Sequence, residues 1–334
     1  MPATHYLVDG TRYEFGDELA LEEAGICEAE AALASKPQAG RSSGLRVSPS
    51  MASPDTTCRR EKVIEACLDY GIDPRKHWAA TEGTAIHKAL MENPLPYHFY
   101  ELSVPGGLHL YDRDMGAMAL RVWSRDGQLS MERPGVSLRR NEEDRVYEVE
   151  IFPGIFMHTT IDRVSPDFRE IANYKTTKYP KVYGGKPGSA PKPPTEFWKD
   201  GNGNLLPPRD YLIQVNLERK ILETCTGVPV VSMKVPRRYI GAHEPNWAFK
   251  LFNVPKIPDD ALEAACREHY ESLTFLLSEG QRYRAESDER LQAFLATLPM
   301  DGYVKGMYNN TKCFKYCSHQ AACFALAGLS LNSL

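Results

Sequence analysis

Apolar residues along the chain follow three successive spacings. Helical spacing comes first, at Val63, Ile64, Cys67 and Leu68, and again over residues 81–90. Apolar and polar residues then alternate in five segments that we predict as strands, at residues 107–114, 116–124, 145–152, 154–164 and 168–177. Helical spacing returns over residues 210–225 and 259–298, separated by a predicted strand at 227–238. This order predicts an α/β or α+β domain, with a sheet covered by helices.

The N-terminal part is patterned more weakly. An acidic, alanine-rich stretch at residues 17–34 predicts a helix, and the serine, proline and glycine of residues 35–55 indicate a linker. We therefore expect an extension at residues 1–47, partly helical, and one folded domain at residues 48–334. Residues 179–208 hold many prolines and glycines and predict a long loop.

Composition narrows the class of protein. The chain has 334 residues, of which 42% are hydrophobic and 25% charged, as in globular domains. Its apolar runs are shorter than the roughly 18 residues of a membrane span, and the first residues lack a secretory pattern, so we expect a cytoplasmic protein. The net charge of −4 does not by itself favour nucleic acid, which requires a local basic groove.

The segment from Gly154 to Lys178 carries the candidate chemistry. It predicts a hairpin in which Asp162, near the end of one strand, lies opposite Asn173 and Lys175 on the other. Oxygen ligands can hold a divalent ion that activates water, and a lysine can stabilise developing negative charge. The grouping is typical of phosphodiester hydrolysis.

Four short motifs in this order resemble the PD-(D/E)XK nuclease superfamily, in particular its RecB/AddB-like branch: Gly83-Thr-Ala-Ile-His87, Asp162, Asn173-Tyr-Lys175 and Gln214. The resemblance implies a restriction-endonuclease-like core, with a central mixed sheet flanked by helices. It implies Mg²⁺ or Mn²⁺ bound by His87, Asp162 and the residue at 173, with Lys175 catalytic. Gln214 would support the site or contact DNA.

Two positions depart from that pattern. Asn173 stands where the family has Asp or Glu, and Glu218 stands where a tyrosine usually follows the glutamine by four residues. Three interpretations of Asn173 remain open: a natural loss of activity, an introduced inactivating substitution, or a site that recruits another carboxylate. Glu170 is predicted to point away from Asn173, and Glu148 and Glu150 cannot be placed from the sequence.

Three cysteines near the C-terminus, Cys313, Cys317 and Cys323, predict a metal centre. A fourth ligand would come from His319, which suits Zn²⁺, or from Cys58. The resemblance implies a [4Fe–4S] cluster held by Cys58 and the three C-terminal cysteines, joining the N- and C-terminal parts of the domain. The other cysteines are predicted to be core residues: Cys27, Cys67, Cys225 and Cys266.

DNA is the expected partner, bound as ends or single strands. Candidate phosphate-contacting residues are Arg59, Arg60, Lys178 and Lys181. The chain has no GxxxxGK[ST] motif, so unwinding would require a helicase or another recombination or CRISPR partner. The resemblance implies an exonuclease of recombination, repair, CRISPR adaptation or phage DNA metabolism. Two alternatives stay open: an inactive DNA-binding member of the same fold, and a zinc-stabilised interaction module.

Overall fold

The structure is a computed structural model of the chain. It describes residues 4–8, 11–16, 18–23, 25–27, 31, 47–53, 57–68, 71–75, 136–141, 146–159, 161–165, 167–178, 198–199, 203, 205–240, 249–301, 317 and 319–327. The chain divides into two compact units. The first comprises residues 1–47, 51–81 and 266–334, and the second comprises residues 48–50 and 82–265.

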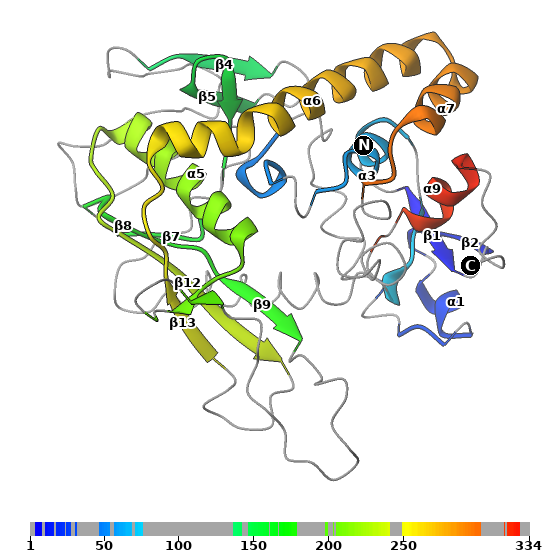
Figure 1. Ribbon diagram of the computed structural model, residues 1–334. Coiled ribbons are helices and arrows are strands. Elements are labelled where there is room, and N and C mark those ends of the chain that lie inside the picture. Colours follow the sequence, from blue (N-terminus) through cyan, green and yellow to red (C-terminus); the bar gives the residue numbers. More distant parts are fainter. Residues whose placement is uncertain are drawn as a thin grey trace. The chain divides into compact units, whose positions relative to one another are not determined.

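The second unit is built on a five-stranded mixed sheet (Figure 1). Its strands are β7 (Arg163–Val164), β8 (Glu170–Ala172), β9 (Lys175–Lys178), β12 (Ser232–Ile240) and β13 (Phe249–Asn253). β12 pairs antiparallel with β13 and parallel with both β8 and β9, in one unbroken register from Glu170↔Ser232 to Lys178↔Ile240. β8 and β9 are therefore one strand in their pairing, which is interrupted only at residues 173–174.

Helix α5 (Arg209–Thr226) makes the crossover between β9 and β12. Its sequence alternates apolar and polar positions at helical spacing, and it ends at Gly227, whose φ of 73° lies in the left-handed region that glycine tolerates best. Val215 and Leu222 pack into a core with Ile171 and Val235 of the sheet. A strand, a helix and a parallel strand in this order form a βαβ unit, so the fold is mixed α/β as predicted.

The remaining elements of this unit are shorter. A three-stranded antiparallel sheet contains β4 (Leu138–Asn141), β5 (Val146–Phe152) and β6 (Ile155–Met157), and β10 (Trp198–Lys199) pairs with β11 (Leu205–Leu206). The predicted strands at 145–152 and 154–164 correspond to β5, β6 and β7. Those at 107–114 and 116–124, and the helix at 81–90, lie outside the described residues.

The N-terminal residues of the first unit form strands as well as a helix. β1 (His5–Val8) pairs antiparallel with β2 (Thr11–Glu14) and parallel with β3 (Gly71–Ile72), and α1 (Glu18–Glu23) follows. Tyr6, Leu21 and Ile72 are fully buried in one small core, and the Tyr6 hydroxyl donates to the carbonyl of Ala31 at 2.9 Å. Within residues 1–47, the described part is thus packed with residues 71–72 in the same unit.

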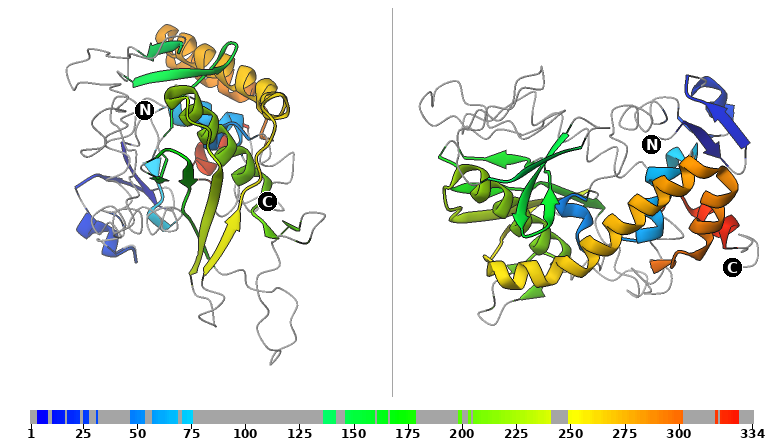
Figure 2. Two further views of the ribbon diagram at one scale, coloured as in Figure 1. Left: turned by 90° about the vertical axis from the view of Figure 1, so that its left-hand side faces the viewer. Right: turned by 90° about the horizontal axis from the view of Figure 1, so that it is seen from above.

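The other elements described in the first unit are mainly helices. They are α3 (Arg59–Cys67), α7 (Asp288–Thr297), α9 (Gln320–Leu326) and the part of α6 (Asp259–Glu286) from residue 266 onward. α3, α7 and α9 pack on one another (Figures 1 and 2). α6 approaches α3 closely at Gly280, where an added Cβ would lie 2.7 Å from the sulfur of Cys67. A short 3-10 helix spans Pro49–Met51.

The predicted helical stretch at 259–298 is broken at Ser287. The side chain of Ser287 accepts a hydrogen bond from the backbone N–H of Arg290 at 3.2 Å, as an N-cap of α7. The stretch therefore forms two helices, α6 and α7, and not one continuous helix. Among the described helices, none is both long enough and apolar enough to cross a membrane.

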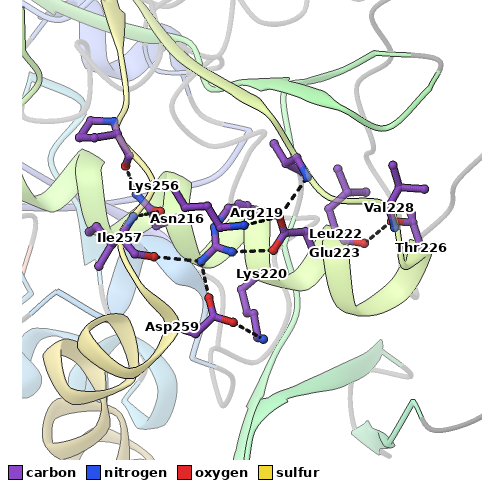
Figure 3. A network of polar contacts seen from close by, with 12 residues as sticks. Asn216, Arg219, Lys220, Leu222, Glu223, Thr226, Val228, Lys256, Ile257 and Asp259 are labelled. Carbon is purple, nitrogen blue, oxygen red and sulfur yellow. Dashed lines mark hydrogen bonds and ion pairs between the residues drawn. The ribbon is translucent and has the colours of Figure 1, made fainter.

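A buried arginine ties α5 to the chain that enters α6 (Figure 3). Arg219 is fully buried, and its guanidinium contacts Glu223 at 2.5 Å and Asp259 at 2.7 Å. Lys220 binds the other oxygen of Asp259 at 2.6 Å, and Asn216 accepts from the backbone N–H of Ile257 at 2.9 Å. This network fixes α5 to the segment that joins β13 to α6.

We expect Arg219→Ala to lower the free energy of unfolding by about 3 kcal/mol, because it empties the space of a fully buried side chain and removes its ion pairs with Glu223 and Asp259. Lys220→Ala is the matched control. It removes a contact to the same Asp259, but Lys220 and Asp259 are both partly exposed, so a loss below about 1 kcal/mol is expected. Urea unfolding of the two variants measures the difference, and equal losses would contradict it.

Candidate functional site

The predicted hairpin around Asp162 is present. β7 pairs antiparallel with β8, with Arg163 opposite Ala172 and Val164 opposite Ile171. The Asp162 carboxylate lies just before β7 and accepts a hydrogen bond from the backbone N–H of Tyr174 at 2.6 Å. This bond fixes Asp162 at the point where β8 passes into β9, beside Asn173.

Helix α5 brings three polar side chains to the same place. Asp210, Gln214 and Glu218 are four residues apart, so they share one face of the helix. Gln214 is 9% exposed and Glu218 only 1%, although both are polar. Gln214 Nε2 donates to Glu218 Oε1 at 2.8 Å, which holds the carboxylate in place.

Asn173 and Glu218 are bonded directly. Asn173 Nδ2 donates to both oxygens of the Glu218 carboxylate, at 2.9 Å to Oε1 and 3.1 Å to Oε2. The amide oxygen, Oδ1, is buried and has no hydrogen-bond partner among the described residues. A buried oxygen without a donor is costly and is a group that a cation can satisfy. The carboxylates of Asp162 and Glu218 with this oxygen therefore fit a divalent ion that prefers oxygen ligands.

Burial governs the charge of the two carboxyl groups on α5. It raises the pKa of Glu218 to about 8; Asp162 also raises it, while Lys175 and the amides of Gln214 and Asn173 act against the shift. Burial also raises the pKa of Asp210, against the charges of Lys175 and Arg237. With a pKa of about 8, the Glu218 carboxyl holds a proton near neutral pH until a nearby positive charge displaces it.

Two cations line the same region. Lys175 begins β9, and Arg237 lies opposite it on β12. Both approach the ring of Tyr211, with Lys175 Nζ at 5.2 Å and the Arg237 guanidinium carbon at 5.5 Å from its centroid. Arg237 is buried and also lies 5.2 Å from the ring centroid of Tyr239. The carboxylates thus have positive charge beside them, as an anionic substrate requires.

The other glutamates considered for the site are bonded elsewhere. Glu148 is buried and pairs with Arg139 at 2.7 Å, Glu150 accepts from the backbone of Gly154, and Glu170 lies 3.7 Å from Lys234. The carboxylate that Asn173 bonds directly is instead that of Glu218.

His87 and Lys181 lie outside the described residues, as does the side chain of Lys178. Arg59 and Arg60, the other predicted phosphate contacts, belong to the first unit. Arg59 donates through Nε and Nη2 to the two oxygens of Asp301, at 2.8 and 2.9 Å, and Arg60 is buried with Nη1 donating to the carbonyl of Leu298. Both guanidinium groups thus bind residues of the first unit, and these contacts do not support DNA binding by either residue.

The described cysteines that were predicted as metal ligands belong to the first unit. Cys58, just before α3, and Cys317 are buried, and Cys323 of α9 is half-buried. Burial raises the pKa of the Cys317 thiol, and Glu61, Cys323 and Cys58 raise it further through their charges. Cys58 and Cys323 are thus each close enough to Cys317 to act on its charge, while Cys313 is outside the described residues. Cys67, Cys225 and Cys266 are core residues, as predicted, whereas Cys27 is exposed.

No family model, curated protein or solved structure matches this chain. Two clusters of polar side chains, one in each unit, carry the candidate chemistry. In the second unit, Asp162, Asn173 and Glu218 offer oxygen ligands beside Lys175. In the first, thiols lie next to a histidine and a glutamate.

The sequence interpretation missed the role of Glu218, Asp210 and Tyr211. A pattern was available, because Asp210, Gln214 and Glu218 are polar residues at helical spacing along one side of α5. Such a face is usually solvated. Here it is buried against the strand that carries Asn173, and this depends on the crossover packing rather than on α5 alone.

Proposed function

We propose that the chain is a metal-dependent phosphodiester hydrolase acting on DNA. The observation that carries this proposal is the meeting of Asp162, Asn173 and Glu218 beside Lys175, where the buried Asn173 oxygen has no hydrogen-bond partner in the part of the chain that the structure describes. It agrees with the resemblance to PD-(D/E)XK nucleases, in which a strand carboxylate, an acidic group and a lysine act together. The restriction-endonuclease-like core is part of the same proposal, and the βαβ unit formed by β9, α5 and β12 supports it.

The residues divide the chemistry between them. Asp162, Glu218 and Asn173 Oδ1 would hold Mg²⁺ or Mn²⁺, with His87 as a further ligand by resemblance. When bound, such an ion polarises the phosphate and lowers the pKa of a coordinated water. Lys175 would orient the attacking water or stabilise charge on the phosphate, and Arg237 would lie near the same anion. Gln214 positions Glu218 through its hydrogen bond.

By resemblance, the substrates are DNA ends or single strands, and the settings are recombination, repair, CRISPR adaptation or phage DNA metabolism. A helicase or another partner would supply strand separation. The resemblance also implies the [4Fe–4S] cluster of Cys58, Cys313, Cys317 and Cys323. The closeness of the three described cysteines supports a metal centre there.

The test is a hydrolysis assay with the full chain. End-labelled single strands, linear duplexes and covalently closed circles are incubated with Mg²⁺ or Mn²⁺, and with EDTA. We expect cleavage of the linear substrates that stops in EDTA and returns when metal is restored. Asp162→Asn, purified in parallel, should fall to background, whereas Asp167→Asn, which changes an exposed carboxylate in the turn of the same hairpin, should keep wild-type activity.

Equal cleavage by wild type and Asp162→Asn would identify a contaminant and contradict the proposal. Failure of the wild type to cut any substrate at any metal concentration would also contradict it. If DNA were still bound in that case, the inactive DNA-binding alternative would take its place.

A further inference from the structure

A second cluster of possible metal ligands lies in the first unit. Glu61 is in the first turn of α3, Cys317 precedes α9, and His319 is the N-cap of α9. Each offers one ligand atom, and these atoms all lie within 4.8 Å of one another. Cys317 and His319 are buried, at 8% and 4% exposure. A thiol, an imidazole and a carboxylate so close together form a set that a soft or borderline cation prefers.

A candidate fourth ligand, outside that group of three, lies next to it in sequence at the start of α3. Cys58 is the N-cap of the helix, three residues before Glu61, and side chains at that spacing are neighbours on a helix surface. Cys58 is 7% exposed and interacts electrostatically with Cys317. Cys323 also lies near Cys317, but it is less buried and is one turn into α9, where its backbone N–H donates to His319 at 2.8 Å.

The ligand-bearing segments are held by the protein. Arg59, between Cys58 and Glu61, donates to both oxygens of the buried Asp301 and, through Nη1, to Ser272 at 2.9 Å. Its backbone N–H donates to Asp301 as well, at 3.1 Å. The first turn of α3 is therefore fixed by bonds to residues 272 and 301, and α9 packs on the same helix. Metal sites need ligands that are positioned in this way.

The spacing discriminates between two kinds of centre. Ligand atoms about 2.0–2.3 Å from a single tetrahedral Zn²⁺ lie about 3–4 Å from one another, and those of Glu61, Cys317 and His319 lie within 4.8 Å, so small side-chain shifts would bring them to one ion. A cubane takes four thiolates spread around four irons. Glu61 and His319 lie within 4.8 Å of the Cys317 sulfur, and neither belongs to a Cys₄ ligand set.

We propose that Glu61, Cys317, His319 and Cys58 bind one Zn²⁺ in a closed, four-coordinate structural site. This departs from the iron–sulfur cluster that the resemblance implies, and it uses two residues that the resemblance does not include. It is independent of the proposed hydrolase site. Its ligands come from both ends of the sequence, so metal binding contributes to the stability of the first unit directly.

Metal analysis of the full chain tests the site. We expect about one zinc and no iron or sulfide in colourless protein. Glu61→Gln and His319→Ala should each lower bound zinc at least tenfold, since changing only a group that orients a ligand already costs about 10- to 100-fold. Cys27→Ser, at an exposed cysteine of the same unit, and Cys323→Ser should both keep the metal.

Cobalt provides a measurement that does not depend on variants that may fail to fold. Co²⁺ exchanged into the wild-type protein should give the visible bands of a tetrahedral ion and a sulfur-to-metal charge-transfer band of two thiolates. Brown protein with about four irons per chain, retained in Glu61→Gln and lost in Cys323→Ser, would overturn the proposal in favour of the cluster. Protein that holds neither metal and binds no added Zn²⁺ or Co²⁺ would also overturn it. Asp162→Asn serves as a cross-check, because it should abolish hydrolysis without changing zinc content.

Discussion

Glu218→Gln is expected to reduce metal-dependent DNA hydrolysis by about a hundredfold or more while leaving the fold intact. The amide matches the carboxyl in shape, and its oxygen can still accept from Asn173 and Gln214 at the position of Oε1, so only the bond from Asn173 to Oε2 is lost. What is lost is the negative charge that a divalent ion requires. Several kcal/mol of charge stabilisation depend on such an ion, and each 1.4 kcal/mol corresponds to about tenfold in rate.

The double variant Asn173→Asp with Glu218→Gln is the matched control. It places the carboxylate at residue 173, beside the strand, and the amide at residue 218, on the helix. We expect hydrolysis to recover to within about tenfold of wild type, because charge and ligand count are restored even though the geometry shifts. Single-turnover rates at saturating Mn²⁺ separate this effect from weaker DNA binding.

Two outcomes would contradict this role of Glu218. The first is wild-type activity in Glu218→Gln, which would remove the carboxylate from the mechanism. The second is a double variant no better than the single one, although both bind metal equally. Circular dichroism and urea unfolding should show Glu218→Gln to be at least as stable as wild type, since it no longer buries a titratable group.

Magnesium affinity is expected to rise about tenfold for each pH unit up to about pH 8 and to level off above it. The cause is the pKa of Glu218, which burial raises to about 8. Below that pH the ion must displace a proton from the carboxyl, and above it the carboxylate is already free. Between pH 6 and pH 8 the affinity should therefore change nearly a hundredfold.

Calorimetric titration in buffers of different ionisation enthalpy measures the protons released. Close to one proton per ion should leave near pH 6, and few should leave near pH 9. In Glu218→Gln the remaining affinity should be nearly independent of pH across this range. Wild-type affinity that is flat from pH 6 to pH 8 would show that Glu218 is not a ligand.

The same shift has a consequence for stability without metal. Because the pKa of Glu218 is higher in the folded chain than in the unfolded one, the folded chain binds the proton more tightly. The stability that this proton contributes is fully present below the unfolded value of about 4.5 and is lost as pH rises through about 8, on the order of a few kcal/mol. Added Mg²⁺ should restore part of it at high pH.

Local patterns predicted the local parts of the structure. Alternation and turn residues predicted the hairpin that faces Asp162 toward Asn173, and helical spacing predicted α3 and α5. The pairing of β1 with β3 was not predicted, because it is parallel and joins His5–Val8 to residues 71–72. Two short strands so far apart in sequence leave no periodic pattern that links them.

The candidate sites divide in the same way. The positions of Asp162 and Lys175 follow from one hairpin, and sequence spacing is sufficient to place them together. Glu218 is 45 residues from Asn173, and only the packing of α5 on the sheet makes them partners. Likewise, Glu61 looks like an ordinary acidic residue in the first turn of a helix until Cys317 and His319 are placed beside it.

The parallel pairing of β12 with β8 and β9 sets an order of assembly. β7 and β8 are close in sequence, so they can pair early through local contacts, whereas β12 must close the loop from Glu170 to Ser232. Val215 and Leu222 of α5 are buried only once Met233 and Val235 are in place. During synthesis, Asp162, Asn173 and Glu218 leave the ribosome before β12 does. At that stage the strand that holds them together is still missing. The carboxylate cluster is thus a late product of folding, completed only after β12 has left the exit tunnel.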